Sequence, residues 1–406
     1  MSSILRSQLA SLRRDQVAAT SPQAMRDQNL HALLDVFWDN AGQTLTANQL
    51  MEASGLTRAS ALDICRGLEE RGWVIEGPGS RSASPGRRAR QFTFNRTRSL
   101  VVGADIAYTS VSAVVANLAG QVLGHARRDF TAEFPRESRS EHLGATIAAA
   151  LADGDISPDR IETACVGIGA PLDNTGVPPR RNPLWDAVKL EPKNFLPEQT
   201  NWRVLVENDA NLAAWAERSG GRVNPESTFV TLLADEVLGG GIVFEGQLLR
   251  GAHGTAGEMG YVKHVGGVET VEGIGSVWGY YHDELRRRGE TDQNELSSAE
   301  VLLAARRGDE AAAAAVRRAS KRLANVIATL TDLIDPEVVV LAGHLAEHAG
   351  QLIEAINWRL SKIADSPTTV VASTLGDQVV LRGAVEMAID DVRMNTAFFP
   401  TAADAD

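Results

Sequence analysis

Cysteine and long apolar runs are scarce in this 406-residue chain, and each scarcity excludes a class of protein. The two cysteines, Cys65 and Cys165, are far apart and outside any CxxC pair, which argues against a disulfide framework and a thiolate zinc site. We expect both in the core. No apolar run approaches the roughly 20 residues that span a bilayer, and the N-terminus lacks the apolar stretch of a secretory signal. We therefore expect a cytoplasmic protein without a membrane partner.

Lysine is absent from residues 1–98, yet this segment is basic, with 13 Arg, 9 acidic residues and a net charge of +4. The other 308 residues carry 27 basic and 43 acidic side chains, a net charge of −16. A basic head on an acidic body suggests that the head binds a polyanion. An apolar fraction of 44% and a charged fraction of 23% describe a globular chain, and its length favours two or three domains.

The head has the pattern of helices joined by a tight turn. Apolar residues recur at helical spacing from Leu30 to Phe37, which predicts a first helix. A second is expected between Thr46, a plausible N-cap, and Gly55, and a third from Arg58 to about Arg71. The segments GWVIEGPG and QFTFN then read as the strands of a hairpin with a polar, arginine-rich tip. We interpret this as a winged helix-turn-helix.

Such a fold places the N-terminal residues of its last helix against base edges and its wing against phosphates. The residues predicted to contact DNA are Thr57, Arg58, Ser60, Arg66, Arg87, Arg88 and Arg90. A small three-helix bundle whose charged hairpin contacts a protein is the alternative interpretation.

From Ser99 the pattern changes to that of an α/β protein. Apolar strands near SLVVGADI, ACVGIGAPL and RVLVEN are followed by a second strand-rich segment, by helices and by a strand at Val338–Gly343. Strands, helices and Gly turns alternate twice, which predicts two similar lobes with a cleft between them. An alanine-rich helix from about Asp309 to Asp332 packs either within a lobe or between subunits.

The ordered set ADIAYT, GIGAPLDNTG, VENDAN, GGGIVFEGQLLRGAHGTAGEMG and LAGHLA resembles the ROK family, named for repressors, open reading frames and kinases. With the winged head, the chain is similar to the branch of xylose and N-acetylglucosamine repressors. The resemblance implies an actin-like, hexokinase-like body whose cleft binds a sugar or sugar derivative. One winged head contacts too few bases for high specificity, so we expect a homodimer or a dimer of dimers on an inverted-repeat operator.

The resemblance assigns the cleft residues. The residue that matches the general base of ROK kinases is Asp209, which follows Asn208 at a junction of strand and helix; a simple helix N-cap is the alternative role. Glu258 matches a further sugar ligand, and Glu272 matches another more weakly; taken alone, each is an ordinary surface carboxylate. Tyr261 stands where the family has a sugar-binding histidine.

Two departures from the family pattern concern ATP and zinc. The expected first phosphate turn has Tyr108 in place of glycine, and the second has Asp235 and Glu236, carboxylates that would face phosphate oxygens. The zinc loop has Tyr261 at the histidine, and side chains without nitrogen or sulfur donors suited to zinc at the three thiolate positions, Lys263, Val265 and Thr270. We therefore expect no catalytic residue, no ATP cofactor and no structural zinc.

The expected organisation is a flexible N-terminus (1–24), the winged head (25–97), an N-lobe (98–213) with helix 378–396 packing back on it, a C-lobe (214–377) and a flexible tail (397–406). The favoured hypothesis is a catalytically silent regulator, most readily a repressor, that binds DNA and senses a carbohydrate. The alternatives are a regulator whose body only dimerises or binds a partner, an active sugar kinase, and an interaction module without a DNA role.

Overall fold

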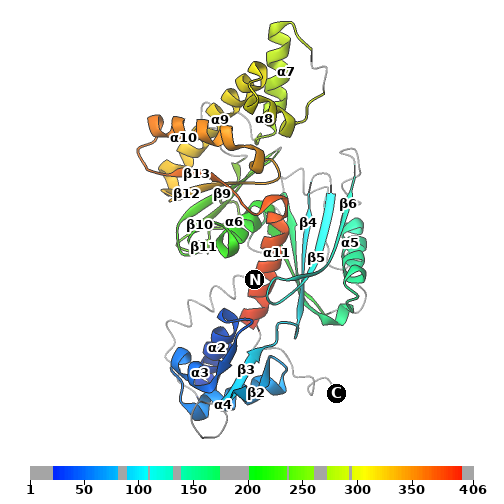
Figure 1. Ribbon diagram of the computed structural model, residues 1–406, viewed down its shortest axis with the longest axis vertical. Helices are drawn as coiled ribbons and strands as arrows, with labels where there is room; N and C mark the ends of the chain where they lie inside the picture. The colour runs from blue at the N-terminus through cyan, green and yellow to red at the C-terminus, as the bar shows by residue number, and fades with distance from the viewer. Residues whose placement is uncertain are drawn as a thin grey trace.

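The computed structural model describes residues 22–80, 89–107, 110–130, 139–173, 201–235, 237–259, 272–291 and 295–395. Figure 1 shows an elongated molecule with the head at one end, then a first α/β lobe and then a second. Helix α11 (Val379–Asn395) runs from the lobes toward the head. None of the described helices is long and apolar enough to cross a membrane.

The head combines three helices with a small antiparallel sheet. Its core gathers Leu33, Phe37, Leu50, Phe92 and other fully buried side chains. The sheet order is β1-β3-β2, and the short strand β1 was not foreseen from the sequence. The elements are α2 (Pro22–Asp39), β1 (Thr44–Thr46), α3 (Ala47–Ser54), α4 (Arg58–Glu70), β2 (Val74–Ser80) and β3 (Ala89–Phe94).

Local chemistry fixes the ends of these helices. Thr46 and Gln49 form a capping box at the start of α3, and Gly55 ends it in the left-handed region, with φ +69°. Thr57 then caps α4. Both helices were predicted closely. The expected boundary at residue 25 is wrong by a few residues, because α2 begins at Pro22, a residue favoured in the first turn of a helix.

The two lobes contain sheets of the same design. The first has the order β6-β5-β4-β7-β8 and the second β11-β10-β9-β12-β13, and in each the first three strands are antiparallel and the last three parallel. The first-lobe elements are β4 (Leu100–Ile106), β5 (Ser110–Asn117), β6 (Val122–Asp129), α5 (Arg139–Asp153), β7 (Ile161–Ile168) and β8 (Arg203–Asn208). The predicted pair of similar lobes is confirmed at the level of these sheets.

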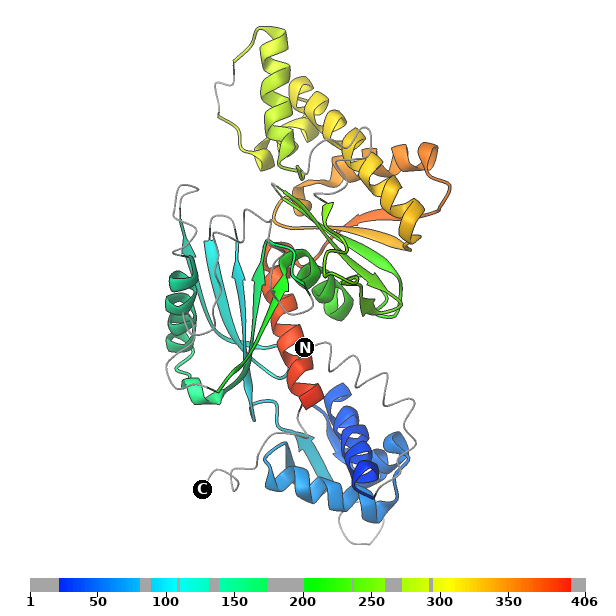
Figure 2. The ribbon, with the colours of Figure 1, turned by 180° about the vertical axis from the view of Figure 1, so that it is seen from behind.

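The second lobe carries its helices on the side away from the head (Figure 2). Its elements are β9 (Phe229–Ala234), β10 (Leu238–Phe244), β11 (Gln247–Leu248), α7 (Ser276–Arg288), α8 (Ser298–Arg306), α9 (Glu310–Ile334), β12 (Val338–Ala342), α10 (Gly350–Ile363) and β13 (Thr369–Ala372). The alanine-rich helix α9 packs within this lobe, against α7, α8 and α10.

Helix α6 (Asp209–Gly220) crosses from one lobe to the other. It continues β8 of the first sheet and packs on β9 and β10 of the second, and it also lies along α11. The lobe boundary expected at residue 213 is therefore wrong as a division of the chain, since it falls inside a continuous helix.

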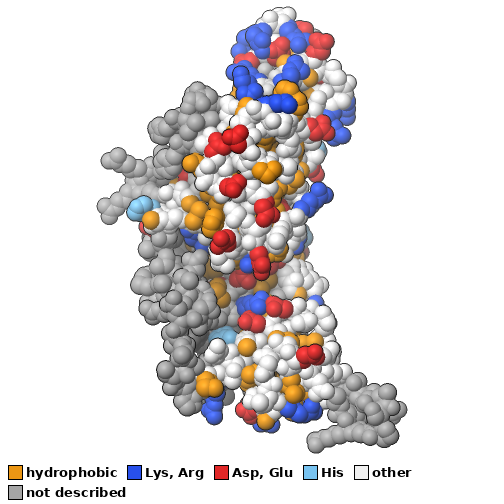
Figure 3. Space-filling view, turned by 90° about the vertical axis from the view of Figure 1, so that its left-hand side faces the viewer, with side chains coloured by type: hydrophobic (Ala, Val, Ile, Leu, Met, Phe, Trp, Pro, Cys, Tyr) orange, Lys and Arg blue, Asp and Glu red, His pale blue; other side chains and the backbone are white. Residues whose placement is uncertain are grey.

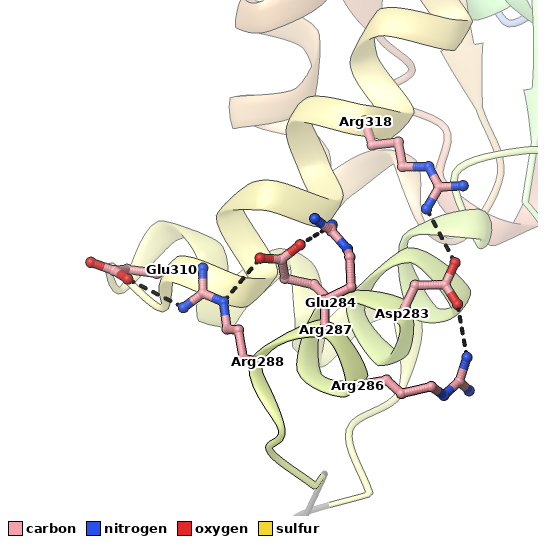
Figure 4. Close-up of polar contacts among 7 residues, drawn as sticks. All are labelled: Asp283, Glu284, Arg286, Arg287, Arg288, Glu310 and Arg318. Carbon is pink, nitrogen blue, oxygen red and sulfur yellow. Dashed lines mark hydrogen bonds and ion pairs between the residues drawn. The ribbon is translucent and has the colours of Figure 1, made fainter.

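The tip of the second lobe, at α7 and α9, carries many arginines, and Figure 3 shows them gathered at that end. Figure 4 shows that they are matched by carboxylates of the same two helices. The pairs are Arg286 with Asp283, Arg318 with Asp283, Arg287 with Glu284, Arg288 with Glu284, and Arg288 with Glu310. The basic charge of the tip is thus compensated locally.

Candidate functional site

The end of β8 places Asn208 and the adjoining Asp209 at the junction of the lobes, and the two side chains have different roles. Asn208 is the N-cap of α6: its Oδ1 accepts from Asn211 N at 3.1 Å, and its Nδ2 donates to the carbonyl of Ala170 at 3.2 Å. Asp209 is the first residue of the helix, so the alternative that it serves as the N-cap is wrong. Its Oδ1 accepts from Ala210 N at 2.7 Å, and the backbone N–H of Asp209 itself also bonds to the carboxylate.

The Asp209 carboxylate lies between glycines of both lobes. A Cβ at Gly169, after β7, would be 3.2 Å from Asp209 Oδ2, and a Cβ at Gly239, on β10, would be 4.0 Å from Oδ1. The predicted site residue is therefore where the two sheets face each other. Glycine at both positions leaves room beside the carboxylate.

Asp209 shares this region with two further carboxylates, Asp105 at the end of β4 and Glu258 in the loop after β11. Burial raises the pKa of Asp209 to about 6, an effect opposed by hydrogen bonds from backbone N–H groups and increased by the charge of Asp235. Burial and then the charge of Asp209 raise the pKa of Asp105 to about 7. The same two causes, in the same order, raise the pKa of Glu258 to about 7. These three residues, the carboxylate trio, form one electrostatically coupled group.

A buried ion pair that sequence reasoning missed supports the trio. Arg250 donates to Glu207 Oε2 through Nε at 2.8 Å, and its NH2 group lies 2.7 Å from the same oxygen. The other oxygen of Glu207 accepts from Asn208 N at 3.0 Å and from Asn211 Nδ2 at 2.9 Å. One carboxylate thereby fixes both the start of α6 and the start of the loop that carries Glu258.

Backbone packing completes the placement of that loop. Gly254 and Gly257 have φ of +70° and +83°. A Cβ at Gly254 would lie 1.7 Å from Leu172 O in the first lobe, and one at Gly257 would lie 2.0 Å from Gly240 O in the second. Only glycine permits both the conformation and the contact. The loop therefore touches both lobes, and its glycines could have been recognised from the GAHGTAGEMG segment.

Two predicted cleft residues are not placed with the trio. Glu272 forms an isolated bridge with Val237, and its carbonyl accepts from Arg322; its exposed carboxylate is not among the charges that shift the pKa values of the trio. Tyr261 lies outside the described residues, as do the zinc-loop positions Lys263, Val265 and Thr270. Among the residues that the structure describes, no cluster of three His, Cys, Asp or Glu side chains has the arrangement of a metal site.

The second lobe holds an acid of a different kind. Asp235, just after β9, accepts from Leu345 N at 3.1 Å and lies 3.1 Å from His344 Nδ1. A Cβ at Gly343 would lie 2.4 Å from its carboxylate oxygens. The carboxylate thus covers the turn after β12, beside an open cavity of about 510 Å³ lined by Gly275, Trp278, Ser297, Ser298, Ala299, His344 and Leu345. Tyr108 and Glu236 lie outside the described residues.

In the head, the start of α4 presents polar side chains to solvent. Thr57 Oγ1 accepts from Ser60 N at 3.3 Å and lies 2.9 Å from Ser60 Oγ. Arg58 is exposed and donates to Asn48 Oδ1 at 2.8 Å, which joins α4 to α3. Arg66, two turns further along, pairs with Asp63 at 3.2 Å. Of the four residues predicted here, Thr57, Arg58 and Arg66 are thus exposed and Ser60 is half-buried.

Arg90 has a different environment from the one expected. It donates to both carboxylate oxygens of Glu76, at 2.7 and 2.6 Å, and lies over the ring of Phe92. This bidentate bond lowers the pKa of Glu76. Arg90 therefore holds the two hairpin strands together, and its contact with DNA remains a prediction. Arg87 and Arg88 lie outside the described residues.

Comparison with known proteins agrees with this architecture. Residues 101–391 match the ROK family. The chain belongs to the ROK family. It is 23% identical over 394 residues to a xylose repressor of Caldicellulosiruptor bescii, a match that covers 91% of this chain and 97% of the repressor. It is 26% identical over 331 residues to a glucokinase of Streptomyces coelicolor, with 71% of this chain and 97% of the glucokinase covered.

Solved structures of ROK proteins share the fold. A ROK transcriptional regulator homologous to the E. coli MLC protein superposes with a TM-score of 0.72 at 20% identity and covers 92% of this chain and 98% of its own. A ROK glucokinase from Streptomyces griseus, in complex with glucose and AMPPNP, gives 0.59 at 23% identity, with 72% and 100% covered. The mixed α/β body with two actin-like sheets is therefore that of the ROK fold.

Proposed function

We propose that the protein is a sugar-responsive transcriptional repressor that binds operator DNA through its head. The observation that carries this proposal is the arrangement of α3, the turn at Gly55 and α4, with Thr57 and Arg58 exposed and Ser60 half-buried at the start of α4. Together with the β2–β3 hairpin, this arrangement supports the proposal of a winged helix-turn-helix, a motif whose second helix enters the major groove. The xylose repressor match covers 91% of the chain and therefore takes in at least part of the head, while the glucokinase match covers 71% of it.

The charge distribution supports the same assignment. Residues 1–98 have a net charge of +4 and the remainder −16. The arginines of α7, the other basic region, are paired with carboxylates. One head covers few base pairs, so we propose a homodimer or a dimer of dimers on an inverted repeat.

DNA binding is tested by capturing fragments of the source genome on the full-length protein and measuring the affinity of the enriched sequence against salt. We expect an affinity that falls steeply with salt, and Arg58→Ala to weaken binding to the enriched site. Arg317→Ala, an exposed arginine of α9 far from the head, is the matched control. Equal affinities of Arg58→Ala and the parent protein would remove the assigned role of α4.

The cleft supplies the sensor in this proposal. Carboxylates accept hydrogen bonds from vicinal hydroxyls, and Asp209 and Glu258 occupy the junction of the lobes. Because a ligand shifts an equilibrium only by its differential affinity for two states, a sugar that closes the lobes changes operator affinity by that difference. Calorimetric titration with D-xylose and D-glucose tests this step. We expect Asp209→Asn to weaken the binding of whichever sugar binds.

We propose further that phosphoryl transfer is lost. Asp235 places a carboxylate on the backbone turn Gly343–Leu345, where an incoming phosphate would meet a like charge. A sugar kinase remains the second candidate, because a carboxylate with a pKa of about 6, such as Asp209, suits a general base and glucokinases are among the relatives. Sugar-dependent ADP formation from ATP and magnesium, abolished by Asp209→Asn, would establish that candidate instead.

A further inference from the structure

Two helices meet between the lobes: α11 rests on the first sheet, while α6 continues β8 of that sheet and packs on the second. Helix α6 is tied to the second lobe: a Cβ at Gly241 on β10 would lie 2.2 Å from Ala210 O, and Arg218 Nε donates to Gly246 O at 2.7 Å. Ser373, after β13, donates to Glu217 of the same helix. A displacement of the second lobe therefore acts directly on α6, whose first residue remains joined to β8 of the first lobe.

Helix α11 is tied to the first lobe. A Cβ at Gly103 on β4 would lie 2.8 Å from a methyl group of Val385, so the helix rests directly on the sheet. Near its C-terminal end, Asp391 accepts from Thr163 Oγ1 at 2.9 Å and from Arg203 Nε at 2.8 Å. These bonds join the helix to the starts of β7 and β8.

The two helices touch at two places along their length. At Gly383 the contact is direct, because a Cβ there would lie 1.9 Å from Leu212 O. About two turns further toward the head, the indole N–H of Trp215 donates to Asp390 Oδ2 at 2.9 Å. The two helices are thus held together at two separate points: a close backbone contact at Gly383, about which α6 can turn, and a directional hydrogen bond at Asp390.

The end of α11 reaches the head. Arg393 donates through Nε to Asp35 at 2.8 Å and through NH2 to Asp39 at 3.0 Å, both on α2. Figures 1 and 2 both show this end of α11 beside α2. The apolar core of the head is also continuous with buried side chains of α11 such as Ile389 and Val392. Asp390, which accepts the hydrogen bond from α6, and Arg393, which contacts the head, are only three positions apart in α11.

We propose that α6 and α11 transmit the state of the cleft to the head, with Trp215–Asp390 as the input contact and Arg393–Asp35/Asp39 as the output. Asp209, the first residue of α6, places the start of this route in the sugar site. Closure of the second lobe turns α6 about the Gly383–Leu212 contact, shifts Asp390 and changes the hold of Arg393 on α2. The inference that these contacts carry a sugar signal rests on the proposed function, but the contacts between α6, α11 and α2 are present without a ligand.

The experiment is amide hydrogen exchange on the full-length protein without sugar, followed in α2, α6 and α11. Trp215→Phe keeps the ring and removes the indole donor. We expect it to speed exchange near Asp35 and Asp39 by roughly twofold to fivefold, the effect of weakening one ion pair at a protein surface. Arg393→Gln should speed the same amides, and the double variant should add little, because the contacts act in series. Trp358→Phe, an exposed tryptophan of α10, is the matched control.

Either of two results would overturn the inference. In the first, Trp215→Phe changes amide exchange in α6 and α11 but not in α2. In the second, the effects of Trp215→Phe and Arg393→Gln on exchange in α2 are additive. If Trp215→Phe does not fold, Asp39→Asn takes its place. This change lies at an exposed position of the head and tests the contact of Arg393 with α2, which is the proposed output. The proposed function is judged separately, by whether D-xylose or D-glucose alters exchange of the unmodified protein. Absence of sugar binding would remove the sensor while leaving the exchange result on the link intact.

Discussion

Glu207 and Arg250, 43 residues apart, form a buried ion pair with Nε–Oε2 at 2.8 Å, and this single pair joins α6 to the loop that carries Glu258. The side chains are 5% and 18% exposed, so water does little to compensate the loss of either charge. The local order of the candidate sugar site thus depends on a contact outside the carboxylate trio.

Loss of one member of this pair should be costly. We expect Glu207→Gln to lower the free energy of unfolding by about 3 kcal/mol, because Arg250 is left buried without its counter-charge. Urea unfolding measures the change. The combined variant Glu207→Gln with Arg250→Met should recover part of the loss, and a double variant less stable than Glu207→Gln alone would contradict this account. The exposed pair Arg127–Asp129 supplies the control, since Asp129→Asn should change stability little.

The carboxylate trio should make stability depend on pH. In the folded state the pKa of Glu258 is raised to about 7 by burial and by Asp209, so between the ordinary value near 4.5 and that value the folded protein binds more protons than the unfolded chain. Stability therefore falls as pH rises from about 5 to 7, and the destabilisation persists above this range. We expect Glu258→Gln to flatten this part of the profile and to raise the melting temperature at pH 8. Melting curves from pH 5 to 8 test it; parallel profiles would show that Glu258 does not titrate in this window.

The sequence predicts the positions of single residues better than the contacts between them. Thr46 and Gly55 were predicted correctly as the ends of one helix and Arg58 as the start of the next, because capping depends on neighbours within a few residues. The place of Asp209 at the junction of the lobes also follows from the strand that precedes it. The ion pair of Arg90 with Glu76, in contrast, was not predicted, since nothing local reveals that the hairpin register places Glu76 opposite Phe92, two residues from Arg90 on the same strand.

The same limit applies to the connection of the head with the body. Asp35 and Arg393 are separated by most of the chain and belong to helices with no shared sequence pattern. Glu207 lies inside the recognised VENDAN segment, yet its partner was assigned no role for the same reason. Only the crossing of α6, α11 and the sheets brings such residues together.

Replacing glycine by alanine should change stability in opposite directions at two positions, one with free space around the new Cβ and one in close contact with a neighbouring helix. Gly67 lies in the interior of α4, and a Cβ there meets nothing within 4 Å, so Gly67→Ala should stabilise the protein by about 0.5–1 kcal/mol through the entropy of the unfolded chain. Gly383→Ala should instead be strongly destabilising, because its Cβ would lie 1.9 Å from Leu212 O. Thermal melts of the two variants check the opposite signs, and a stable Gly383→Ala protein would mean that α6 and α11 separate easily.

The carboxylate of Asp235 should hold the turn after β12 in place, because it accepts from Leu345 N and sits beside His344 with only 27% of its own side chain exposed. Asp235→Ala removes a charge-assisted bond and leaves the Leu345 N–H without this partner, and we expect a loss of about 1.5–3 kcal/mol. The same change removes the negative charge that faces an incoming phosphate. AMPPNP with magnesium, titrated into the parent protein and the variant, separates the two effects: binding gained only by Asp235→Ala identifies the carboxylate as the barrier to nucleotide. Equal binding by both proteins would show that Asp235 does not exclude phosphate, and the kinase candidate would then rest on Asp209 alone.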